Sequence, residues 1–367
     1  MSTFRDINAR AWNECRLLSV LLELTHLCNY DCFFCYNDRI DRRAPLTLDE
    51  YSDLLQQLAE MAVLNLTLTG GEPVVRPDFF AIGGRARELG FVVRIKSNGH
   101  LIRGEVARRL KEEVAPYQVD LSLHGATAET HDRQTRRPGS FVRLLANIDE
   151  MKRLGLRVKL NCTVTSWNEH EIEAMFALAD RLDLAYTFNA SVSPRDDGDR
   201  HPLTVAPTAR GMANLARYLE TRHAANSPDD LDPESTPQAA DGAPPVVRHC
   251  GAGSSSATID QWGNVLPCVQ WRREVGNIRE APFAEIWKGS AALAEVQRIT
   301  IAAKDAARAF KGPRAVAFFC PGMAELLTGD PLAVYPAAPG GQDDALPGTP
   351  PVENQPHVPR LSESEPL

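Results

Sequence analysis

Residues 17–35 read LLSVLLELTHLCNYDCFFC: a mainly apolar run, and directly after it three closely spaced cysteines. The run 17–24 has the length and composition of a buried β-strand. Cys28, Cys32 and Cys35 then follow in one loop, although the whole chain has only eight cysteines. Such a cluster can be a zinc site, a disulfide knot, an iron–sulfur cluster or a coincidence.

Apolar strand-like runs alternate with amphipathic helix-like segments after this loop. Thr47, with Glu50 three residues later, predicts the start of the first helix. Further strands are predicted over 64–69, 91–98, 118–124, 156–165 and 184–191, and helices over 47–61, 77–90, 103–113, 140–155 and 169–182. This alternation predicts an α/β fold with a mainly parallel sheet. The repeats are too few for a full eightfold barrel, so we expect a partial, TIM-like (β/α)6 barrel with its chemistry at the carboxyl ends of the strands.

The composition changes along the chain and predicts five segments. Residues 223–247 are rich in Pro, Asp, Ser and Ala, which is typical of a linker, and the Pro-rich and acidic end of the chain predicts disorder. The predicted segments are an N-terminal segment 1–16, a partial barrel 17–222, the linker 223–247, a smaller C-terminal unit 248–335 and a disordered tail 336–367.

The charge and the N-terminus exclude several classes of protein. The formal net charge of −8 favours neither nucleic acid nor an anionic membrane as partner. The N-terminus lacks the apolar core of a secretory signal, and no segment has the ~20 apolar residues of a membrane span. We therefore expect a cytoplasmic protein, in which thiols stay reduced and clustered cysteines bind metal or act in catalysis.

The spacing C-x3-C-x2-C favours iron over zinc in the first cluster. Structural zinc takes four ligands, and no fourth Cys or His follows nearby in a zinc-like pattern; His26 lies at the end of the strand. Three thiolates can instead hold three irons of a 4Fe–4S cluster and leave the fourth iron open. With Phe34 before the third cysteine, the loop resembles the signature of the radical S-adenosylmethionine (SAM) enzymes. The resemblance implies that the open iron binds SAM and that reductive cleavage yields a 5′-deoxyadenosyl radical.

Three further strand ends carry motifs that resemble the same family. In LTLTGGEP, residues 66–73, Gly70 and Gly71 predict a close approach of the backbone to a ligand, and the resemblance implies that Glu72 binds the SAM amine. In IKSNGH, residues 95–100, it implies that Ser97 and Asn98 line the adenosine site. In the same way Ser122 is implied near the carboxylate or ribose, and Phe34 beside the cofactor.

Several nearby residues keep open roles. The resemblance implies a basic partner for the SAM carboxylate, for which Arg133, Arg136 and Arg143 are candidates, and an adenine side for which Asn161 and Thr165 are candidates. Cys162, inside a predicted strand, is expected to be a core residue, and Cys15 a structural one.

The C-terminal unit contains Cys250, Cys268 and Cys320. A predicted hairpin that turns at Gly263 and Asn264 can bring the first two together. The pattern C-x12-G-x4-C with a later cysteine resembles the auxiliary-cluster extensions called SPASM and Twitch. A full SPASM extension has more cysteines, so the resemblance implies one auxiliary 4Fe–4S cluster, with His249 a conceivable fourth ligand.

These features together predict a radical SAM oxidoreductase. The resemblance favours modification of a ribosomally made peptide, with a small molecule or cofactor precursor as the alternative substrate. It also implies an electron donor such as a flavodoxin or ferredoxin. A non-catalytic iron–sulfur or zinc scaffold is the hypothesis from another class.

Overall fold

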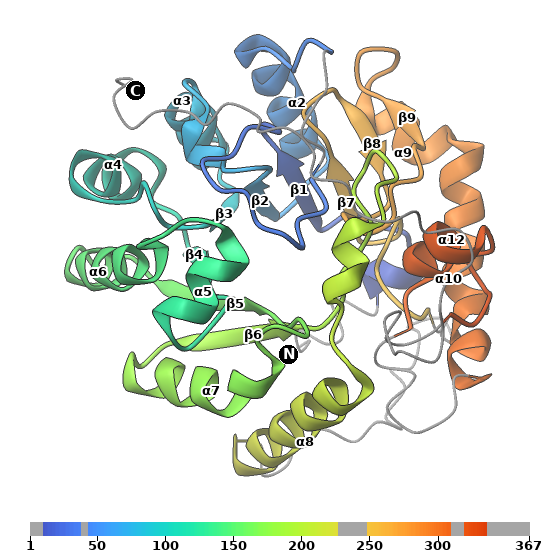
Figure 1. Ribbon diagram of the computed structural model, residues 1–367. Helices are drawn as coiled ribbons and strands as arrows, with labels where there is room; N and C mark the ends of the chain where they lie inside the picture. The colour runs from blue at the N-terminus through green and yellow to red at the C-terminus, as the bar shows by residue number, and fades with distance from the viewer. Residues whose placement is uncertain (1–9, 38–42, 227–247, 310–318, 336–367) are drawn as a thin grey trace.

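Six parallel strands form the sheet that the sequence predicts. The computed structural model describes residues 10–37, 43–226, 248–309 and 319–335 (Figure 1). The strands are β1 Ser19–Glu23, β2 Asn65–Thr69, β3 Val92–Ser97, β4 Gln118–Ser122, β5 Val158–Thr163 and β6 Ala185–Asn189. Each lies inside its predicted range and pairs in parallel with the next in sequence. The predicted α/β partial barrel is confirmed.

Five predicted helices cover the outer face of this sheet (Figure 1). They are α2 Leu48–Glu60, α3 Phe79–Glu88, α4 Gly104–Arg109 continued by a π-helical turn at Leu110–Val114, α6 Ser140–Arg153, and α7 Ile172–Arg181 after the 3-10 turn Glu169–Glu171. The predicted capping box of α2 is present, because Thr47 and Glu50 each accept a backbone N–H from the other. Local sequence therefore starts α2 where the pattern indicated.

Other helices had no clear sequence signal. They are α5 Ala128–Thr135, α8 Ala209–Asn226, α9 Phe283–Gly289, α10 Ala291–Ala309 and α12 Pro321–Thr328, with 3-10 turns at Pro73–Val75 and His201–Val205. The inward face of α5 is polar, with Thr130, His131 and Gln134 buried, so it lacks an apolar period. No helix in the described ranges is long and apolar enough to cross a membrane.

Two predicted segments fall largely outside the described residues. Helix α8 ends at Asn226, four residues into the predicted linker 223–247. Residues 227–247 and the predicted tail 336–367 lie outside the described part of the chain.

The C-terminal unit extends the same sheet. Strand β7, Ser256–Ile259, pairs in parallel with β1, and β8, Asn264–Leu266, and β9, Gly276–Asn277, follow it antiparallel. The sheet order is β6-β5-β4-β3-β2-β1-β7-β8-β9. Gly263, with a φ of +88°, turns the predicted β7–β8 hairpin. Sequence reasoning had treated this unit as separate; the structure joins it to β1.

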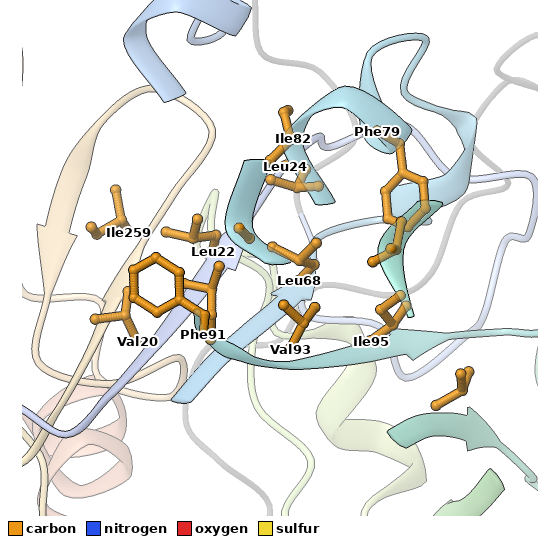
Figure 2. Close-up of a cluster of buried hydrophobic side chains, with 14 of the residues drawn as sticks. Val20, Leu22, Leu24, Leu68, Phe79, Ile82, Phe91, Val93, Ile95 and Ile259 are labelled. Carbon is orange, nitrogen blue, oxygen red and sulfur yellow. The ribbon is translucent and has the colours of Figure 1, made fainter. Parts of the chain in front are cut away.

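The core lies between the sheet and its outer helices. Figure 2 shows Leu22, Leu68 and Ile95 from neighbouring strands close to Phe79 and Ile82 of α3. Residues that alternate with these apolar ones point to the opposite, inner face of the sheet. On that face the strands carry mostly polar side chains, so the inner face is a polar surface rather than a second apolar core.

Candidate active site

The three-cysteine loop lies directly after β1, at the carboxyl end of the parallel strands. Cys28 Sγ accepts hydrogen bonds from Tyr30 N at 3.4 Å and from Asn98 Nδ2 at 3.8 Å. The middle of the loop is held to the end of α5, where Phe33 N donates to Gln134 O at 3.1 Å. The structure therefore brings this loop beside the Ser97–Asn98 motif.

Gly70 and Gly71 contact the backbone of the segment after β1. A Cβ atom at Gly70 would overlap Thr25 O, and one at Gly71 would overlap Leu27 O. Gly71 N donates to Thr25 O at 2.6 Å and Glu72 N to Leu27 O at 2.8 Å. Sequence reasoning had explained the two glycines by approach to a ligand. In the structure they allow the loop that follows β2 to pack against the backbone of Thr25 and Leu27, which leads into the cysteine loop.

Glu72 lies fully buried next to this contact. One carboxylate oxygen accepts from Ser97 Oγ and the other from Asn98 N, both at 2.8 Å. Burial raises its pKa to about 7, while these hydrogen bonds act in the opposite direction. A buried carboxylate with a raised pKa favours a cationic partner. Its surroundings suit the predicted role as acceptor for an ammonium group.

The loop after β3 is fixed by residues that sequence reasoning missed. Asn98 Nδ2 donates to Asn29 Oδ1 at 2.7 Å. Asn147, buried on α6, donates to Gly99 O at 2.7 Å and to His100 O at 3.0 Å. No local pattern marks Asn147, because its partners lie almost fifty residues earlier in the chain.

An aromatic wall lies beside the third cysteine. The ring centroids of Phe34 and His124 are 4.7 Å apart, and His131 stacks on His124 at 5.8 Å. Burial lowers the pKa of His124 to about 3 and that of His131 to about 4, so both rings are neutral near pH 7. Ser122 lies one strand beyond the Glu72 cluster, on β4 opposite Asn161 of β5.

The candidate arginines occupy different positions around the loop. Arg136 Nη1 pairs with Asp31 at 3.2 Å, and the guanidinium of Arg133 lies 4.1 Å from the ring centroid of Trp167. Arg143 lies in the first half of α6.

Two further residues that the sequence singled out, Cys162 on β5 and Thr165 just after it, have buried surroundings. Thr165 Oγ1 accepts from the buried Gln134. Cys162 is fully buried in the apolar core, which confirms the prediction made for it.

The chemistry of the loop thiols fits metal binding. All eight cysteines are free. Burial raises the pKa of the Cys28 thiol far above its usual range, and Glu72 and Cys35 raise it further. A thiolate in this environment needs a positive charge beside it, which bound iron provides. Within the described ranges, no three His, Cys, Asp or Glu side chains converge as ligands of a single metal ion.

The C-terminal cysteines come from three separate segments that meet. Cys250 precedes β7, Cys268 follows β8, and Cys320 is the N-cap of α12. Burial raises the pKa of Cys320 to about 11, and the charges of Cys268 and Cys250 add to that rise. The segments that carry them are in contact, because a Cβ atom at Gly322 would overlap Trp271 and the ring centroids of His249 and Phe319 are 5.6 Å apart. His249 Nε2 lies 2.7 Å from Phe319 O, so this nitrogen is already engaged by the protein.

Comparisons with known proteins agree with this arrangement. Residues 22–179 match the family model of the radical SAM superfamily, and residues 250–310 match SPASM, an iron–sulfur cluster-binding domain. The chain is 31% identical to the pre-heme d1 synthase of Dinoroseobacter shibae, covering 87% of this chain and 85% of that protein. It is 30% identical to the PqqA peptide cyclase of Streptomyces rochei, covering 87% and 88%.

A solved structure shares the fold. SuiB of Streptococcus suis, bound to SAM, superposes with a TM-score of 0.63 at 17% identity, over 80% of this chain and 71% of that one. A family signature at the carboxyl ends of the strands and relatives aligned over most of their length lead to one conclusion: this chain belongs to the radical SAM superfamily, is an enzyme, and carries a SPASM iron–sulfur domain.

Proposed function

We propose that this enzyme modifies a ribosomally made peptide. In this proposal residues 17–222 form the catalytic barrel, where Cys28, Cys32 and Cys35 hold the 4Fe–4S cluster that binds SAM. Residues 248–335 form the auxiliary domain, where Cys250, Cys268 and Cys320 hold one further cluster. When bound, the first cluster and SAM supply a 5′-deoxyadenosyl radical for hydrogen abstraction from the substrate.

The protein's own residues orient and shield the cofactor in this proposal. Glu72 accepts hydrogen bonds from the SAM amine. Ser97 and Asn98 hold the Glu72 carboxylate in place by the hydrogen bonds that they already donate to it. Phe34 and the neutral ring of His124 form an apolar surface that excludes water beside the third cysteine. Gly70 and Gly71 serve this set indirectly, because their close packing on the backbone of Thr25 and Leu27 fixes the position of Glu72, and Ser122 is its further member on β4.

The polar inner face of the barrel is the observation that carries the peptide assignment. Lys96, Asp120 and Lys159 lie side by side on the neighbouring strands β3, β4 and β5. Two residues further along the strands, Ser122 of β4 lies beside Asn161 of β5. Further polar residues on this face are Thr69, Thr163, Thr187 and Asn189. Hydroxyl, amide and charged groups suit a substrate with many hydrogen-bonding groups, such as a polypeptide. Similarity to a protein named PqqA peptide cyclase supports the same class.

A small-molecule substrate is the second candidate. It is favoured by the similarity to a pre-heme d1 synthase, which is as extensive as that to the peptide cyclase. The cationic side chains of Lys96 and Lys159 on the inner face could hold acidic groups of such a molecule.

The radical chemistry is tested with the anaerobically reconstituted protein. With dithionite and SAM it should release 5′-deoxyadenosine; a cluster-replete protein that releases none would contradict the assignment. Joint replacement of Cys28→Ala, Cys32→Ala and Cys35→Ala should abolish this release and retain the auxiliary iron, measured by iron and sulfide analysis. Loss of all iron would contradict two separate cluster sites.

The substrate class is tested by isotope transfer. Short peptides encoded beside this gene, synthesised with deuterium at carbon, should transfer deuterium to 5′-deoxyadenosine. Transfer from a deuterated haem precursor, and none from the peptides, would select the second candidate.

The surroundings of the enzyme complete the proposal. The eight free thiols support a reducing, cytoplasmic location. We propose a flavodoxin or ferredoxin as the electron donor, to be identified by replacing dithionite with each purified protein in the deoxyadenosine assay.

A further inference from the structure

Four residues between the two cysteine sets form a closed ring of hydrogen bonds, three of them between side chains and one between backbone groups. Glu23, at the end of β1, accepts from Tyr36 Oη on one carboxylate oxygen and from Arg272 Nη1 on the other, both at 2.9 Å. Arg272 Nη2 donates to Asp196 Oδ2 at 2.8 Å. Asp196 N donates to Tyr36 O at 2.9 Å, which closes the ring.

The ring joins segments that are far apart in sequence, and two of these segments carry cysteines of the two candidate cluster sites. Tyr36 directly follows Cys35, the third cysteine of the SAM-cluster loop. Arg272 lies four residues after Cys268 of the auxiliary set. Between them, Glu23 belongs to the barrel. The ring is therefore a direct polar connection between the loop after β1 and the segment after β8.

The charges in the ring are shielded from solvent. The side chain of Glu23 is 4% exposed and those of Arg272 and Asp196 are 18% and 15% exposed. Burial opposes the charge of Arg272, but Glu23 and Asp196 raise its pKa above its ordinary value, so it remains a cation. A planar guanidinium can bridge two carboxylates at once, which the single ammonium of a lysine cannot do with the same geometry.

The same cation follows the turn that holds the auxiliary cysteine. Cys268 Sγ accepts a hydrogen bond from Gln270 N at 3.4 Å, and Cys268 O accepts one from Trp271 N at 3.0 Å, so Arg272 comes directly after this turn. A positive charge held next to a cluster stabilises the electron that reduction adds, because the reduced cluster carries one more negative charge.

We propose that Arg272 is a positioning residue that holds the auxiliary-cluster segment against the SAM-cluster loop through Glu23 and Asp196, and that its charge raises the reduction potential of the auxiliary cluster. This inference rests on the proposed assignment of Cys268 as a ligand of that cluster. Net charge is one of the properties by which a protein sets the potential of an iron–sulfur cluster.

A potentiometric titration followed by EPR spectroscopy tests the proposal. The full chain with Cys28→Ala, Cys32→Ala and Cys35→Ala serves as background, so that only the auxiliary cluster contributes a signal. In it, Arg272→Gln should shift the midpoint potential to a more negative value, and Glu23→Gln to a more positive one. Opposite shifts identify charge as the cause, since damage to the fold would not follow the sign of the removed charge.

Two further variants complete the test. Arg272→Gln removes the cation that the two carboxylates share, so the double variant Glu23→Gln with Arg272→Gln restores the charge balance and should return the potential toward that of the background. The matched control is Arg273→Gln, because Arg273 pairs with Glu295 and Glu325 outside the ring and its loss should leave the potential unchanged.

Each contrary result has its own meaning. A background protein without iron refutes the proposed ligand set and this inference with it. A loaded cluster whose potential moves in the same direction in Arg272→Gln and Glu23→Gln, or in neither, overturns the role of Arg272 alone and leaves the proposed function intact.

Discussion

At Gly71 the chain passes so close to Leu27 that a side chain has no room. We expect Gly71→Ala to lower the free energy of unfolding by about 1–3 kcal/mol, because the added methyl group must displace backbone rather than a flexible side chain. Urea unfolding of the metal-free protein measures the change.

Gly84→Ala is the matched control for this substitution. The nearest atom to a Cβ there lies 3.8 Å away, and the residue is inside α3, so alanine should stabilise the protein by ~0.5–1 kcal/mol. Equal effects of the two substitutions would contradict the steric explanation for Gly71.

His131 should make the protein sensitive to acid. Its pKa is lowered to about 4 in the folded chain by burial, so below pH ~6.5 the unfolded state binds more protons than the folded state. Stability should therefore fall as the pH falls from ~6.5 toward 4, and this one histidine should cost about 2 kcal/mol at pH 5.

The comparison of His131→Asn with the parent isolates this contribution. Urea unfolding of the metal-free proteins at pH 7.5 and pH 5 should show a smaller loss in the variant, by about the same 2 kcal/mol. The exposed His170→Asn is the control for replacing a histidine as such, and its free energy of unfolding at pH 7.5 should match that of the parent. An unchanged loss in His131→Asn would show that other groups cause the acid sensitivity.

At the scale of elements, α6 holds the loop that carries the Ser97–Asn98 motif. Replacing Asn147 by alanine leaves two buried carbonyl groups without their donor, so we expect a loss of about 1–3 kcal/mol of stability. The variant should also bind SAM more weakly in the reconstituted enzyme, because Asn98 moves when the loop that contains it is no longer held by Asn147. Asn214→Ala, on the exposed side of α8, should stay within ~0.5 kcal/mol of the parent.

The elements also show where prediction from sequence succeeds. Strands β1 to β6 and helices such as α2 follow from apolar periodicity and a capping box, which are local properties. Helix α5 escaped prediction, because its buried residues are polar and are satisfied by contacts made only after folding. Strand β7 was expected only as half of a hairpin, because its parallel partner β1 lies more than two hundred residues earlier.

For the whole molecule, the C-terminal unit should be required for a folded barrel. Strand β7 covers the edge of β1, and Trp271, Phe283 and Val296 belong to the same apolar core as the barrel strands. A chain ending at Asn226 exposes that edge and that apolar surface, so we expect it to aggregate. Sedimentation of the expressed protein measures this.

A chain ending at Tyr335 is the control for this truncation. It retains all the contacts described here and should stay in the supernatant with an unchanged unfolding midpoint. A soluble, cooperatively unfolding chain 1–226 would instead show that the barrel folds without the SPASM domain.

Taken by itself, the sequence determined the α/β class, the six strands, the cysteine loop and the order of the family motifs, since each depends on spacing within a short segment. Tertiary structure decided what joins these pieces: the parallel pairing of β7 with β1, the backbone contact that requires Gly70 and Gly71, and the ring through Arg272. The physical reason is distance along the chain. Residues 23 and 272 can form an ion pair only after the whole sheet has assembled, and no local pattern records a contact that depends on the packing of every element between them.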